Sequence, residues 1–253
     1  MAGAPTTPRT LVIACGALAR ELLCVNELNG LDNVTIECLP ASLHNRPSEI
    51  PDAVRARIRR ARGEERLDTA ETGAGDSPMV KELAGADLVD GEVRVGAADF
   101  GTGGSLFDRI LIGYADCGTG GLLDRVCEEE GVERLPGAHC YEFFATGPRF
   151  EQLQDHALGS FYLTDFLVKH FDRLVWQGLG LDRHPELLPM YFGNYTRLVY
   201  LAQTDDPGLE EQAVAAAERL GLELDVERTG YGELESTVVE FTRRPERASG
   251  ASS

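Results

Sequence analysis

The sequence lacks a Cys-X-X-Cys pair, although it contains six cysteines. Zinc ribbons and related sites use such closely spaced pairs, so this class is excluded and any metal site must be assembled from distant segments. The chain also lacks a GxGxxG turn after a strand and a GxxxxGK[ST] phosphate loop. The fingerprints of dinucleotide-binding and P-loop proteins are therefore absent.

Long apolar runs are missing too, since none approaches the 18 residues that a transmembrane helix needs. The first ten residues contain one arginine and no apolar stretch, so they do not resemble a signal peptide. We expect a soluble, cytoplasmic protein that does not contact a membrane. In that compartment the six cysteines are not expected to form a disulfide framework.

Positive charge is scarce, because 24 Lys and Arg residues stand against 42 Asp and Glu residues, giving a net charge of −18. Nucleic-acid binders carry a basic face, so we expect no nucleic-acid partner. The one basic run, "RARIRRAR" at 55–62, falls on a predicted amphipathic helix. A solvated helix face is the simpler interpretation, and a docking face for an acidic partner is the alternative.

Short apolar runs alternate with amphipathic segments along most of the 253 residues, of which 43% are hydrophobic. Strands are predicted at 9–16, 34–39, 110–114, 132–136, 196–204, 223–230 and 236–241. Helices are predicted at 17–30, from a Ser48 cap to about Arg62, at 122–131 and at 206–222. This alternation indicates an α/β fold with a Rossmann-like, mostly parallel sheet, flanking helices and right-handed crossovers.

Two segments interrupt this pattern. Residues 63–106 contain ten acidic and three basic residues and no strong period, so we interpret them as an acidic insertion that is dispensable for folding. Within it we expect a short helix at 78–84 and a hairpin at 87–95. Residues 141–190 are predicted to be helical and aromatic. The chain is then a single α/β domain with its core at 9–62 and 107–242, and a disordered tail at 243–253.

Three cysteines follow strands at the point where each strand ends, namely Cys15, Cys117 and Cys140. The carboxyl ends of parallel strands share one edge of a sheet, and ligands bind there. A helix start after each thiol favours the thiolate, which is the form that binds metal. With His44 and His139 nearby, the pattern predicts a metal site for Zn²⁺ or an iron–sulfur cluster. Unrelated structural cysteines are the alternative.

The other three cysteines, Cys24, Cys38 and Cys127, fall inside predicted helices or strands and are expected to act as small buried hydrophobic residues. The same sheet edge is also expected to bind an anionic or carbonyl-bearing small molecule, because helix N-termini present free N–H groups there. The polar candidates for this cofactor-binding role are Arg197, Tyr231 and Glu233, with ordinary turn chemistry as the alternative.

Five motifs together resemble the family catalogued as domain of unknown function 1638, over residues 9–62 and 107–201. They are "IACGALARE", "LHNRP", "GYADCG", "HCYEFFATG" and "GSFYLTDFL". The resemblance implies a genomic setting beside corrinoid proteins and methyltransferases of one-carbon metabolism. Many relatives have His-Asp-Cys where this chain has Ala138, His139 and Cys140, so His139 replaces the family's aspartate. The acidic insertion is additional to the family.

Three functions follow from these observations. The first is a metal-binding protein that serves corrinoid-linked methyl metabolism, with a corrinoid protein or a methyltransferase as its partner. The second is a zinc-dependent thiol methyltransferase, in which zinc activates a substrate thiol. The third is a non-catalytic acidic adaptor that uses the aromatic segment 161–167, for which plain core packing is the simpler interpretation.

Overall fold

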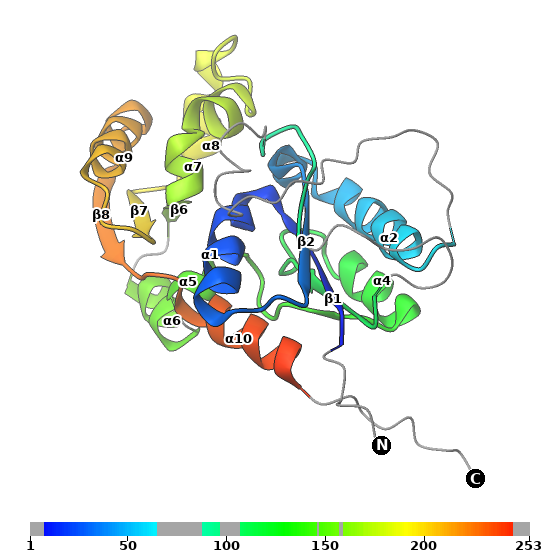
Figure 1. The fold of residues 1–253 in the computed structure, drawn as a ribbon. Helices are drawn as coiled ribbons and strands as arrows, with labels where there is room; N and C mark the ends of the chain where they lie inside the picture. Colours follow the sequence, from blue (N-terminus) through cyan, green and yellow to red (C-terminus); the bar gives the residue numbers. More distant parts are fainter. Residues whose placement is uncertain (1–7, 65–87, 97–106, 146, 157–158, 245–253) are drawn as a thin grey trace, which may run out of the picture.

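The computed structural model describes residues 8–64, 88–96, 107–145, 147–156 and 159–244, whose strands divide between two sheets (Figure 1). Sheet A has the order β3-β2-β1-β4-β5, and only β3 is antiparallel to its neighbour. Its strands are β1 (Thr10–Cys15), β2 (Val34–Leu39), β3 (Val93–Val95), β4 (Arg109–Gly113) and β5 (Glu133–Arg134). The predicted α/β class and mostly parallel pairing are confirmed.

Sheet B is fully parallel, with the order β6-β7-β8, and its strands are β6 (Ser160–Thr164), β7 (Arg197–Ala202) and β8 (Glu223–Arg228). The division into two sheets was not predicted. The helical prediction for 141–190 is wrong at β6. Its Phe, Tyr and Thr side chains favour strands, and pairing with β7 supplies the backbone hydrogen bonds of an edge strand.

The helices connect these strands as the alternation predicts. They are α1 (Ala19–Asn29), α2 (Ile50–Ala61), α4 (Leu122–Glu130), α5 (Glu142–Ala145), α6 (Gly147–His156), α7 (Asp165–Lys169), α8 (Leu188–Phe192), α9 (Pro207–Leu220) and α10 (Gly232–Arg243). Gly30 and Gly131 end α1 and α4 in the left-handed conformation, which glycine adopts without strain. No helix among the described residues is long and apolar enough to cross a membrane.

Two local predictions are wrong. The strand predicted at 236–241 belongs to α10, because Leu234, Val238 and Phe241 are buried at the i, i+4, i+7 spacing of a helix face. The Ser48 side chain does not cap α2, which instead continues from a 3₁₀ turn over Pro47–Glu49.

Each sheet has its own core. In sheet A, α1 and α10 cover one face, and α2 and α4 cover the other (Figure 1). In sheet B, Leu163, Leu198 and Tyr200 pack against α7 and α9, whereas Tyr162 and Leu201 pack on the opposite face with α6. Parallel strands that are buried on both faces explain the continuous apolar runs of the sequence.

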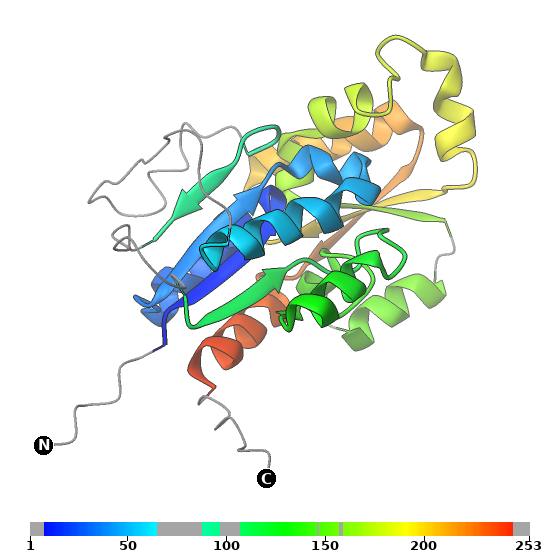
Figure 2. The same cartoon turned by 90° about the vertical axis from the view of Figure 1, so that its right-hand side faces the viewer.

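Part of the predicted acidic insertion is built into sheet A. β3 lies at the outer edge beside β2 (Figure 2), so the predicted hairpin at 87–95 is wrong. The carbonyls of Leu88 and Val89 accept hydrogen bonds from Ala41 and Ser42, and Val89 is buried. Residues 88–96 are thus part of the packed structure, and the dispensability of the insertion for folding stays a prediction. The helix predicted at 78–84 lies outside the described residues.

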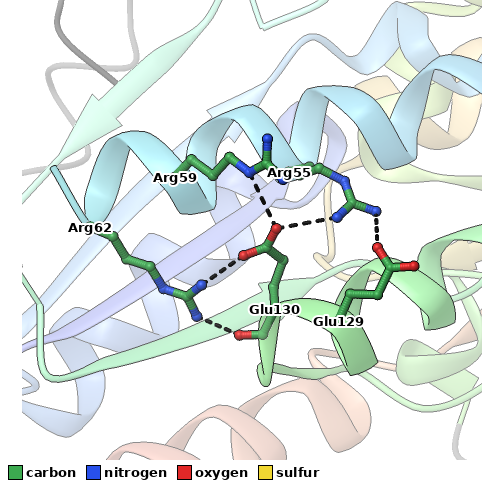
Figure 3. A network of polar contacts seen from close by, with 5 residues as sticks. All are labelled: Arg55, Arg59, Arg62, Glu129 and Glu130. Atoms are coloured by element: carbon green, nitrogen blue, oxygen red, sulfur yellow. Dashed lines mark hydrogen bonds and ion pairs between the residues drawn. The ribbon is translucent and has the colours of Figure 1, made fainter. Parts of the chain in front are cut away.

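The basic run of α2 binds acidic residues of the chain itself (Figure 3). Arg55 contacts Glu129 at 2.6 Å and Glu130 at 3.2 Å, Arg59 contacts Glu130 at 3.4 Å, and Arg62 contacts it at 2.7 Å. The Glu130 side chain is only 8% exposed. These arginines therefore tie α2 to α4, and no separate acidic partner is needed to explain them.

The Glu130→Gln substitution should lower the free energy of unfolding by about 1–2 kcal/mol, between the values for exposed and buried ion pairs. Glu129→Gln is the matched control, because Glu129 is 60% exposed and, in the part of the chain that the structure describes, its ion pair is with Arg55. It should cost only a few tenths of a kcal/mol. Urea unfolding of the wild type and the two variants measures the difference. Equal losses of unfolding free energy in both variants would show that the burial of Glu130 does not add to the stability of the ion pairs.

Candidate thiol site at the carboxyl edge of sheet A

The strand order of sheet A reverses between β1 and β4. From β1 the chain moves to β2 on one side, and it later crosses to β4 on the other side. In open α/β sheets ligands bind outside the carboxyl ends of the strands at such a reversal. Cys15 is the last residue of β1, and the segment from Tyr114 to Cys117 follows β4 directly. Two of the predicted thiols therefore flank the point that topology marks for a ligand.

Cys117 and Cys140 are brought into direct contact. Their Sγ atoms lie 2.8 Å apart, and both side chains are buried. Backbone hydrogen bonds join the two turns that carry them, since the Cys117 N–H donates to the Ala138 carbonyl at 2.8 Å and the Asp116 N–H donates to the Gly137 carbonyl at 3.1 Å. The thiol contact thus rests on a backbone scaffold.

The backbone of Cys117 is strained. Its φ of +48° is the only positive value of a non-glycine residue in the described part of the chain. The left-handed region costs an L-residue with a Cβ about 1–2 kcal/mol. The Asp116 carboxylate holds this turn by accepting hydrogen bonds from the Thr119 hydroxyl and the Gly121 N–H, both at 2.8 Å. Non-glycine residues with a left-handed backbone are found preferentially at functional sites.

The turn before Cys140 is held by Glu142. Its carboxylate accepts hydrogen bonds from the backbone N–H groups of Ala138 at 3.2 Å and His139 at 3.0 Å. The His139 ring stacks on Tyr141, with 4.9 Å between the ring centroids. The structure thus places the His139 imidazole against an aromatic ring, which limits its freedom to turn toward a metal ion.

A small, partly open cavity of about 20 Å³ adjoins the thiols. Cys15, His44 and Cys140 line it from the sheet A side, while Thr164 of β6 and Leu167 of α7 line it from the sheet B side. The other lining residues are Ala17, Leu18, Ala41, Tyr141, Phe144 and Leu174. This volume suits one water molecule or one ion.

Burial and mutual contact control the protonation of these groups. Burial raises the pKa of Cys15 to about 12. The hydrogen bond between Cys117 and Cys140 lowers the pKa of Cys117 and raises that of Cys140 well above its ordinary value. Burial, and then the nearby His139, lower the pKa of His44, which favours its neutral, metal-binding form.

Tyr114 is a member of this site that the sequence reasoning missed. Its buried hydroxyl lies beside the Cys15 thiol without a hydrogen bond of ordinary geometry. Burial raises the pKa of Tyr114 well above its ordinary value, and the surrounding thiols add to this effect. The sequence could have indicated Tyr114, because it stands in the same "GYADCG" motif as Cys117.

The donor types fit a thiophilic ion, but the observed arrangement is not a finished coordination sphere. In the ranges that the structure describes, no three His, Cys, Asp or Glu side chains already form a group that could hold a metal ion. Cys15, Cys140 and His44 line one cavity, and Cys117 touches Cys140. Coordination by these four residues would therefore require them to move closer together.

The three predicted cofactor-binding residues do not line this cavity. Arg197 begins β7 and so lies at the amino end of its strand, where it pairs with Asp225 at 3.1 Å. Tyr231 directly precedes α10 and lies beside Cys24 and Glu21, while Glu233 is exposed in the first turn of α10. Arg197 is therefore at the wrong end of sheet B for the predicted cleft.

A family model described as "Protein of unknown function (DUF1638)" matches residues 104–238, which is more than half of the chain. The chain belongs to this family. The DUF1638 match contains Cys117, Cys140 and the whole of sheet B, whereas Cys15 and His44 precede it. The predicted membership is confirmed, although residues 9–62 lie outside the match. No curated protein and no solved structure matches the chain.

Proposed function

We propose that this protein binds one thiophilic metal ion, of the Zn²⁺ class, through Cys15, Cys117, Cys140 and His44. One observation carries the proposal. At the carboxyl edge of sheet A, Cys15, Cys140 and His44 line one small cavity, and Cys117 contacts Cys140. Three thiolates and one imidazole are a common donor set of tetrahedral zinc sites.

Charge supplies the driving force for binding. A buried thiol cannot ionise without a compensating charge, and burial raises the pKa of Cys15 to about 12. A divalent cation replaces the thiol protons and neutralises the sulfurs that it binds. The lowered pKa of His44 keeps its imidazole neutral and ready to donate a lone pair. A cation bound in this low-dielectric site attracts the thiolates more strongly than it would in water.

The cavity favours a single ion over an iron–sulfur cluster. Clusters are usually held by four cysteines and contain two or four irons with bridging sulfides. A space of about 20 Å³ accommodates one small atom, and the apolar side chains of Leu167 and Leu174 are part of its lining. Four protein ligands also leave no open position, which is the pattern of a structural zinc site rather than of a zinc methyltransferase.

The link to corrinoid-dependent one-carbon metabolism stays a prediction. It came from the family resemblance, and no contact among the described residues bears on a corrinoid protein or methyltransferase partner. The adaptor interpretation has lost its main support, since Phe166 of the segment 161–167 is buried and Tyr162 and Leu163 also pack into cores.

Zinc titration of reduced, metal-free protein prepared without a histidine tag tests the proposal. We expect one equivalent of Zn²⁺ per chain, with a rise in melting temperature, because an ion that binds only the folded state stabilises it. Cys127 is a thiol buried in α4, so Cys127→Ala is the matched control and should bind as much Zn²⁺ as the wild type. Absence of binding, or binding that Cys15→Ala leaves unchanged, would overturn the proposal.

A further inference from the structure

The contact between Cys117 and Cys140 has a second chemical meaning. A disulfide bond is about 2.0 Å long, so the two sulfurs, now 2.8 Å apart, need to approach by less than about 1 Å. Both residues sit on turns joined by the hydrogen bond from Cys117 to Ala138. Neither residue lies within a helix or a sheet ladder that resists such a movement.

No other neighbouring pair of thiols at this edge has a comparable arrangement. Cys15 and Cys38 lie on adjacent strands, but the register pairs Cys15 with Leu39 and Cys38 with Ala14. Because side chains alternate between the faces of a sheet, these two thiols point to opposite faces. Cys24 and Cys127 lie within α1 and α4.

We propose that Cys117 and Cys140 form a reversible disulfide when a peroxide oxidises the protein, and that this bond releases the metal ion. The release rests on the proposed metal-binding function. The disulfide would remove two of the three sulfur ligands and leave Cys15 and His44, which are too few for a tetrahedral zinc site.

The chemistry balances with hydrogen peroxide as the oxidant. The Cys117 sulfur attacks one peroxide oxygen, the O–O bond breaks, and the released hydroxide takes up a proton to leave as water. The resulting sulfenic acid is attacked by the Cys140 sulfur, the S–O bond breaks, and a second water leaves. Two thiols and one peroxide thus give one disulfide and two waters. A dithiol reductant reverses the step by thiol–disulfide exchange.

The surroundings of the pair permit a small oxidant to approach. The two thiols are buried, but Gly118, Gly120 and Pro136 in the adjoining turns are exposed. The turns that carry the two thiols are therefore in contact with solvent.

Peroxide treatment of reduced, metal-free protein, followed by alkylation and peptide mapping, tests disulfide formation. We expect a Cys117–Cys140 cross-link and the loss of two free thiols per chain. Cys127→Ser should keep the cross-link, and Cys140→Ser should abolish it. Cys15→Ala should also keep it, even though we expect this variant to lose most of its metal, so the test of the pair is separate from the test of the metal site.

The same oxidation of zinc-loaded protein tests the release. We expect one equivalent of Zn²⁺ to appear with a coloured chelator as the disulfide forms, and to rebind after reduction. A protein that binds no zinc but forms the cross-link would refute the proposed function and leave the disulfide standing. Oxidation that spares all six thiols, links another pair, or proceeds without release of bound zinc would overturn this inference.

Discussion

Alanine at any one of Cys15, Cys117 or Cys140 should remove most of the bound metal, and alanine at any two of them should remove little more. The reason is that a four-ligand site works as a unit. Each thiolate contributes charge that the cation neutralises, so the loss of one leaves a site too weak to retain the ion during purification. Metal per chain, measured by mass spectrometry on tag-free protein, gives the result directly.

The remaining cysteines supply the controls for this experiment. Cys24→Ala, Cys38→Ala and Cys127→Ala should keep full metal content and lose on the order of 1 kcal/mol of packing energy. Cys117→Gly should lose as much metal as Cys117→Ala but be more stable, because glycine relieves the strain at φ +48°. Equal, near-zero metal in the wild type and in all these variants would leave the thiols as structural residues.

The two histidines should differ in the same measurement. His44→Ala should reduce metal content more than His139→Ala, because His44 lines the cavity whereas the His139 ring stacks on Tyr141. The reverse order would show that His139 leaves this stack to bind the ion, and that the ligand assignment at His44 is wrong.

Glu21→Gln should stabilise the protein at pH 8 much more than at pH 5. Glu21 lies on α1 with only 3% of its surface exposed, and its Oε2 atom has no hydrogen-bond partner among the described residues. Burial, with a smaller contribution from Asp165, raises the pKa of this carboxyl from 4.5 to about 7. The ionised form is therefore the costly one in the folded state.

The sign of the effect follows from proton linkage. The folded state binds the proton of Glu21 more tightly than the unfolded state, so stability falls as the pH rises from about 4.5 through about 7. A shift of this size corresponds to about 3 kcal/mol at pH 8. Glutamine carries no charge at any pH, and the cost of burying its amide is the same at pH 5 and pH 8.

Urea unfolding at several pH values between 5 and 8 measures the effect. Glu27→Gln is the matched control, because Glu27 is exposed on the same helix, and it should leave the pH dependence of stability unchanged. If the wild type and Glu21→Gln lose stability in parallel over this range, Glu21 is not the group responsible.

The elements around β1, β2 and β4 could be predicted because their signals are local. Short apolar runs that end in polar or glycine residues predicted the bounds of these three strands to within a few residues. Gly30 and Gly131 likewise marked the ends of α1 and α4. The placement of Cys15 and Cys117 at one edge then followed from the geometry of parallel strands.

The errors lie where distant contacts decide the structure. Thr237, Val238 and Val239 favour a strand by intrinsic preference, but Leu234, Val238 and Phe241 bury one helical face of α10. Tertiary packing overrode the local preference there. The second wall of the cavity, with Thr164 and Leu167, could not be predicted either, because it depends on how sheet B meets sheet A.

X-ray absorption at the zinc edge of reconstituted, reduced protein tests the proposed ligand set most directly. Binding by Cys15, Cys117, Cys140 and His44 predicts three sulfur neighbours at about 2.3 Å and one nitrogen at about 2.0 Å. The Cys140→Ala variant, if it retains any zinc, should show two sulfurs at most. A zinc shell of nitrogen and oxygen alone in the wild type would contradict the site.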